Sequence, residues 1–119
     1  MIGRILYWRA CQRMRAIAAQ DPLPVQRDLL LRLLRRAAGT RFGREHGFAE
    51  VRSPEEFRER VPVQDYASML PFLERARDGA ADETWPGVPE SFAVTGSSKH
   101  FPHTKESLRS ALESVAPPK

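Results

Sequence analysis

The sequence has too few cysteines for an intramolecular disulfide and no apolar run long enough for a membrane-spanning helix. Its 119 residues contain a single cysteine, Cys11, which excludes an intramolecular disulfide and a zinc site built mainly on thiolates. Apolar runs reach only four or five residues, whereas a membrane-spanning helix needs about 20. Hydrophobic residues make up 41% and charged residues 29% of the chain, with a mean hydropathy of −0.48. We therefore expect one soluble domain, or a piece of one, in a reducing, cytoplasmic compartment.

Acidic residues are scarce at the beginning of the chain. Ten arginines up to Arg44 are accompanied only by Asp21 and Asp28, a net charge of +8, whereas nine basic and thirteen acidic residues follow, a net charge of −4. A basic first third is typical of contact with nucleic acid or an anionic membrane surface. It is equally typical of one domain whose two parts attract each other.

Two basic helices are predicted at the N-terminus. Ile2–Ala19 carries apolar residues at helical spacing with four arginines mostly elsewhere, and it also resembles a transit peptide, although arginine interrupts it throughout. A second helix from Pro24 has a strong apolar stripe and a C-terminal cap at Gly39. Because a short proline turn joins them, we expect an antiparallel helical hairpin.

Short helices are predicted after this hairpin. Thr40 caps one that ends at Gly47, and Ser53 begins a capping box for a helix to about Arg60. A further turn opens at Asp65, restarts at Pro71 and ends at Gly79. A loop over residues 79–90 follows.

The C-terminal part combines β-prone segments with a final helix. Residues 91–94 and 99–101 flank the polar stretch Thr95–Ser98 and predict a small β-hairpin. Thr104 then caps a helix that places Leu108, Leu112 and Val115 on one face and ends at Pro117-Pro118. The fold class is therefore mainly α, with a small β-hairpin near the C-terminus. We expect 1–119 to be a single unit, made of 1–44, 45–90 and 91–119.

The polar stretch is the one segment that resembles a chemical site. A Gly/Ser/Thr loop offers N–H groups and hydroxyls to phosphate oxygens, and a lysine follows it. The candidate nucleotide-binding residues are Thr95, Gly96, Ser97, Ser98 and Lys99. Composition by itself favours an ordinary hairpin turn.

Other polar and aromatic residues have plainer interpretations. His46 is expected near a helix C-terminus, and no carboxylate or thiol completes a metal set with His100 and His103. Cys11 is expected in a core or groove. Tyr66 and Trp85 are expected to pack. No catalytic or metal-binding residue is therefore predicted.

Three ordered motifs resemble the auxin-responsive promoter (Gretchen Hagen three) family of acyl-acid amido synthetases, in the adenylate-forming superfamily. They are TRFGREHGF at 40–48, FRERVPVQDYASMLPFLERARDG at 57–79 and WPGVPESFAVTGSSKHFPHT at 85–104. The resemblance implies an enzyme that uses ATP with Mg²⁺ to activate an acyl acid as its adenylate and then transfers it to an amino acid amine. It also implies that 95–99 contact the nucleotide, although this loop is shorter than the family's and lacks its second glycine.

The resemblance covers only the N-terminal portion of that family. We therefore expect a fragment of a larger α/β adenylate-forming fold that is inactive alone, with no specific nucleic acid partner. The alternatives are a small basic helical module that binds nucleic acid or an anionic membrane surface, and a truncated product without independent function.

Overall fold

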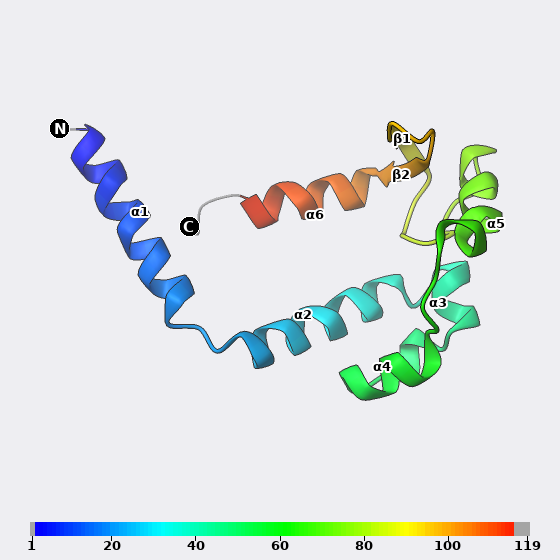
Figure 1. Cartoon of the computed structure of the whole chain (residues 1–119), viewed down its shortest axis with the longest axis horizontal. Helices are drawn as coiled ribbons and strands as arrows, with labels where there is room; N and C mark the ends of the chain where they lie inside the picture. The colour runs from blue at the N-terminus through cyan, green and yellow to red at the C-terminus, as the bar shows by residue number, and fades with distance from the viewer. Residues whose placement is uncertain (1, 116–119) are drawn as a thin grey trace.

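The computed structural model describes residues 2–115, with side chains up to residue 112 (Figure 1). It is mainly helical, with one small antiparallel sheet near its C-terminal end. The elements are α1 (Ile2–Ala18), α2 (Pro22–Ala37), α3 (Arg41–Glu45), a short 3-10 helix η1 (Phe48–Glu50), α4 (Pro54–Arg60), α5 (Tyr66–Arg77), β1 (Pro89–Val94), β2 (His100–Thr104) and α6 (Lys105–Val115). The end of the last predicted helix, at Pro117-Pro118, lies outside the described residues, as does the side chain of Val115.

The first two helices do not form the expected antiparallel hairpin. In Figure 1, α1 and α2 diverge as the two arms of a wide V, and no residue of α1 is buried. Asp21 is extended and its carboxylate accepts a hydrogen bond from the Leu23 N–H (3.1 Å), which begins α2 at Pro22, two residues before the predicted start. The apolar pattern was enough to predict two helices, but it carried no information on the angle between them. Cys11 is consequently half-exposed on α1 and belongs to no core.

The main core forms where α2 meets the short elements that follow it. Its buried residues are Leu34 and Ala37 from α2 together with Phe48 and Val51. Residues packed against this core, partly buried, are Leu30, Leu31, Ala38, Phe42, Phe57, Val61 and Trp85. The apolar stripe predicted for α2 is confirmed, but it is buried only toward the C-terminal end of the helix, since Leu23, Val25 and Leu29 remain exposed.

Thr40 joins the end of α2 to the start of α3. Its side chain is 1% exposed; the hydroxyl donates to the Ala37 carbonyl (2.7 Å) and accepts from the Gly43 N–H (3.0 Å). The same carbonyl accepts the Thr40 N–H at 3.0 Å. The predicted N-cap at Thr40 is confirmed. The predicted C-terminal cap at Gly39 is wrong, because Gly39 does not adopt the left-handed backbone conformation and Thr40 donates to the Ala37 carbonyl instead.

The predicted N-caps at Ser53 and Asp65 are also confirmed, but the predicted capping box at Ser53 is wrong. The Ser53 hydroxyl accepts from the Glu56 N–H (3.2 Å) and begins α4, although the Glu56 carboxylate returns to the N–H of Arg52 rather than to that of Ser53. Asp65 and Ser68 form a reciprocal capping box at the start of α5. The predicted restart at Pro71 is wrong, since α5 runs through this proline without interruption. Pro71 is exposed and removes only one hydrogen bond from a helix that is anchored by its cap and its buried face.

α5 connects to the main core through aromatic rings and a buried carboxylate. Phe72 of α5 packs edge-on against Phe42 at 5.3 Å between ring centroids. Glu83, in the loop after α5, is 4% exposed; its carboxylate accepts from Arg75 Nε (2.9 Å) and lies 3.7 Å from Arg41 Nη1. The loop thereby ties α3 to α5 and fixes the segment that leads into the hairpin.

The described fold is open. Its radius of gyration is 17.7 Å, compared with about 13.5 Å for a compact chain of this length. Its accessible surface is 9121 Å², compared with about 6,500 Å² for a globular monomer of this mass. Much of the excess belongs to α1, α2 and α6, where large apolar side chains face outward. Of the described helices, none is both long enough and apolar enough to cross a membrane.

Candidate functional site

The candidate nucleotide loop is the tip of the β1–β2 hairpin. The strands pair antiparallel, with Ala93 opposite Phe101 and Val94 opposite His100, so that Thr95 and Lys99 face each other at the end of the ladder. Both strands extend beyond the segments predicted from sequence, since β1 begins inside the predicted loop 79–90. The hairpin follows directly from α5 and the 79–88 segment, and it leads directly into α6 (Figure 1).

Hydrogen bonds within the hairpin close the loop tightly. The Thr95 N–H donates to the Lys99 carbonyl (3.0 Å), and the Ser98 N–H donates to the Thr95 carbonyl (2.9 Å). Ser98 has φ +60, the left-handed conformation that closes a three-residue hairpin loop. The interpretation of the stretch as a hairpin turn is therefore correct for the described chain, and any role in binding has to use what this turn leaves available.

The turn leaves two adjacent amides and several polar side chains available. The Thr95 hydroxyl accepts from the Lys99 N–H (3.3 Å) and lies 3.2 Å from the Ser97 hydroxyl. Within the described residues the N–H groups of Gly96 and Ser97 have no hydrogen-bond partner. A Cβ on Gly96 would meet nothing within 4 Å, so the tip is open to solvent. These donors suit one phosphate group and do not enclose a triphosphate.

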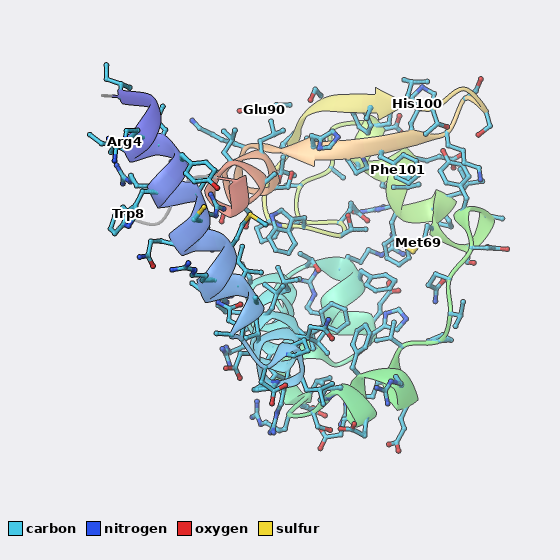
Figure 2. All side chains as sticks on the ribbon, turned by 60° about the vertical axis from the view of Figure 1, so that its left-hand side comes forward. Arg4, Trp8, Met69, Glu90, His100 and Phe101 are labelled. Carbon is cyan, nitrogen blue, oxygen red and sulfur yellow. The ribbon has the colours of Figure 1, made fainter. Side chains whose placement is uncertain are left out.

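A groove of about 490 Å³ runs between the hairpin and α5. Its lining residues come from the start of α5, the loop after it and β2, namely Gln64, Asp65, Tyr66, Met69, Leu73, Thr84, Lys99, Phe101 and Pro102. Figure 2 shows Met69 below Phe101 and His100 on this side of the molecule. Because Lys99 belongs to both the turn and the groove, the two features form one candidate site.

Tyr66 is the residue that fixes the hairpin over α5. Its hydroxyl accepts a hydrogen bond from the His100 N–H at 3.0 Å, and its ring lies 5.9 Å from that of Phe101. The Lys99 ammonium lies 5.4 Å from the Tyr66 ring centroid, a cation–π distance. The sequence predicted only packing for Tyr66, and a tyrosine directly after a capping aspartate carried no signal of this contact. The structure brings it together with Lys99, and thus makes it a site residue that sequence reasoning missed.

Asp65 places a permanent negative charge at one wall of the groove. The hydrogen bond from the Ser68 hydroxyl, followed by that from the Ser68 N–H, lowers the pKa of this carboxyl from its ordinary value of 3.8. The carboxylate is therefore ionised at neutral pH. It lines the groove together with the Lys99 ammonium, which gives the groove one charge of each sign.

The other polar candidates have structural roles. The His46 ring stacks on Phe42 at 4.1 Å between centroids, and its Nδ1 donates to the Phe42 carbonyl (2.9 Å) at the end of α3, as predicted for a helix C-terminus. His100 and His103 both lie on β2, and across the described residues no group of three His, Cys, Asp or Glu side chains could hold a metal ion. Trp85 packs against the main core, as predicted.

Comparison with known proteins places most of the chain in one domain family. The family model described as "GH3 family N-terminal domain" matches residues 13–116. A probable indole-3-acetic acid-amido synthetase of Oryza sativa subsp. japonica is 32% identical over 99 residues, covering 78% of this chain and 16% of the relative. A jasmonoyl–L-amino acid synthetase of the same organism is 29% identical over 100 residues, covering 79% of this chain and 22% of the relative. The chain thus spans about a fifth of the length of these relatives. No solved structure matches it.

Proposed function

The chain belongs to the GH3 family, the family that its motifs resemble, and we propose that it forms the N-terminal part of an acyl-acid amido synthetase. Such an enzyme joins an acyl acid to the amine of an amino acid. The name of one rice relative gives an amide of indole-3-acetic acid, and the name of the other gives jasmonate joined to an L-amino acid. The observation that carries the proposal is the family match over 13–116, which includes the core, α5, the groove and the hairpin loop.

The proposal assigns Thr95–Lys99 to the ATP–Mg²⁺ site. The N–H groups of Gly96 and Ser97 would donate to phosphate oxygens, and the Lys99 ammonium would place a positive charge beside them. Thr95 and Ser98 shape the turn that presents these donors. ATP, when bound, supplies the adenylyl group that gives a carboxylate carbon a good leaving group. Mg²⁺ is expected on the phosphates, because the described residues offer it no acidic cluster.

These 119 residues on their own are proposed to be insufficient for catalysis. The turn serves one phosphate and the groove is open, so nothing among the described residues holds an acyl acid in line with a nucleotide. We expect no exchange of pyrophosphate into ATP that depends on an acyl acid or an amino acid. Robust exchange with any carboxylic acid would overturn this part of the proposal.

The assignment of the loop is tested by titrating the chain with ATP and Mg²⁺ and following its backbone amides by NMR. We expect weak binding, with a dissociation constant on the order of millimolar, and the largest shifts at Gly96 and Ser97. Lys99→Gln should weaken the response several-fold, whereas Lys105→Gln, which removes the same charge outside the loop, should not. Shifts confined to other segments, or equal effects of the two variants, would remove the loop from the nucleotide site.

The substrate class and location complete the proposal. An acyl acid and an amino acid are the expected small-molecule partners, and a cytoplasmic location suits an enzyme that consumes ATP and carries one free cysteine. The assignment as a synthetase predicts that residues 13–94 can replace the corresponding segment of the rice jasmonoyl–L-amino acid synthetase and leave a working enzyme.

A further inference from the structure

α1 is the largest part of the described structure that the proposed function leaves unexplained. It buries no residue, and its large side chains are exposed to a degree that is unusual for a helix of a folded domain. Their exposed fractions are Ile2 76%, Ile5 57%, Leu6 61%, Tyr7 74%, Trp8 62%, Met14 71% and Ile17 58%. A surface of this kind usually marks an interaction site.

The residues of α1 are sorted around its axis. Leu6, Ala10, Met14 and Ile17 follow one another at spacings of three and four and therefore share one face. By the same helical geometry, Arg9 and Arg13 border one edge of this face, whereas Arg4 and Arg15 lie farther round the helix, toward the opposite side. The first acidic residue of the chain, Asp21, comes after the helix has ended.

Aromatic residues lie near the N-terminal end of the same helix. Tyr7 and Trp8 are adjacent and exposed, and Figure 2 shows the side chains of Trp8 and Arg4 pointing away from the rest of the molecule. Tyrosine and tryptophan prefer the boundary between lipid and water, because each has an apolar ring with one polar group.

Most of this surface lies outside the family domain. The GH3 model begins at residue 13, so Arg4, Leu6, Tyr7, Trp8 and Arg9 lie before it. The enzyme assignment therefore does not account for them.

We propose that α1 is an interfacial helix that binds an anionic lipid membrane surface. An apolar face bordered by Arg9 and Arg13, on a helix that carries two more arginines, two aromatics and no acid, matches the chemistry of helices that lie in the headgroup region. Such a helix lies along the surface and does not cross it, which agrees with its length and charge. Two copies of α1 packed on each other would bring arginines together with no acid of α1 to balance them. Nucleic acid would leave the apolar face uncovered.

The test uses the whole 119-residue chain and vesicles of two compositions. We expect binding by co-sedimentation to vesicles that contain about 30% phosphatidylserine and at least tenfold weaker binding to pure phosphatidylcholine. Binding should fall steeply between about 0.05 and 0.5 M salt, because added salt screens the arginines.

Matched variants locate the binding on α1. Each arginine near an anionic surface contributes about fivefold to binding, so Arg9→Gln/Arg13→Gln should weaken it about 20- to 30-fold at low salt. Arg32→Gln/Arg35→Gln on α2, which removes the same charge, should change it less than threefold. Met14→Ser should weaken it about tenfold, whereas Leu112→Ser on α6, at 72% exposure against 71% for Met14, should not. Arg9, Arg13, Met14 and Leu112 are all unburied. Circular dichroism of each variant would verify that it keeps its fold.

Several outcomes would overturn the proposal. No binding to the phosphatidylserine vesicles, equal binding to both vesicle types, or equal loss from the α1 and α2 arginine pairs would each contradict it. Self-association in sedimentation velocity that Met14→Ser abolishes would assign the face to a second copy of the chain. Preferential binding to duplex DNA that depends on the arginines but not on Met14 would assign it to nucleic acid.

Discussion

Replacing Thr40 with valine tests the junction on which the described core is built. Thr40→Val preserves the shape of a side chain that is 1% exposed but removes its hydroxyl. The Ala37 carbonyl keeps its hydrogen bond from the Thr40 N–H (3.0 Å), whereas the Gly43 N–H loses its acceptor at a buried position. A buried donor without a partner costs about 1–3 kcal/mol and loss of an N-cap about 1 kcal/mol. Both figures describe the same bond, so we expect a loss of about 2 kcal/mol rather than their sum.

The assay is urea unfolding followed by circular dichroism and by tryptophan fluorescence, since Trp85 packs against the core. Thr40→Ser keeps the hydroxyl and removes one methyl group, which should cost about 0.8 kcal/mol. If Thr40→Val were within about 0.5 kcal/mol of the unmodified chain, or if the serine variant were equally destabilised, the hydroxyl would not be what holds α2 to α3.

Three further predictions concern Gly43, Ser98 and Asp65. Gly43→Ala would place its Cβ in overlap with the Ala37 carbonyl oxygen, so it should destabilise by about 3 kcal/mol in the same urea assay, and a smaller effect than Thr40→Val would be inconsistent with this contact. Ser98→Gly should stabilise the hairpin by about 0.5 kcal/mol, because the residue has φ +60, measured as slower exchange of the Thr95 amide, which donates to the Lys99 carbonyl; faster exchange would contradict it. The lowered pKa of Asp65 means that its carboxylate stabilises the start of α5 above the unfolded pKa and that this stabilisation is lost as the pH falls below about 4; protection of the Ser68 amide relative to its intrinsic exchange rate at each pH should show it, and Asp65→Asn should remove the pH dependence of that protection.

Local structure was predictable where one side chain satisfies a nearby backbone group. Thr40, Ser53, Asp65 and Thr104 all cap the helices expected from them, since an N-cap needs only a polar side chain and the amides of the next turn. The hairpin was predictable for a similar reason, because β-prone segments and a polar turn are local signals.

Contacts between distant elements were not predictable in the same way. The V-shaped arrangement of α1 and α2 depends on what covers their apolar stripes, and no residue of the α1 stripe is buried in the described structure. Likewise, the contact of Tyr66 with Lys99 and His100 depends on where the hairpin lies over α5, which no local pattern encodes. The candidate site is made from such contacts, so only its loop could be identified beforehand.

The central claim is that this chain supplies the N-terminal part of an acyl-acid amido synthetase, and segment exchange tests it most directly. Residues 13–94 would replace the matching segment of the rice jasmonoyl–L-amino acid synthetase, and conjugate formed from jasmonate and an amino acid would be measured. A second chimera with residues 13–116 would also carry the Thr95–Lys99 loop. The account predicts activity in the first chimera and lower activity in the second, because the tight turn at Thr95–Lys99 leaves two backbone N–H groups for phosphate oxygens. A folded first chimera without any conjugate formation would contradict it.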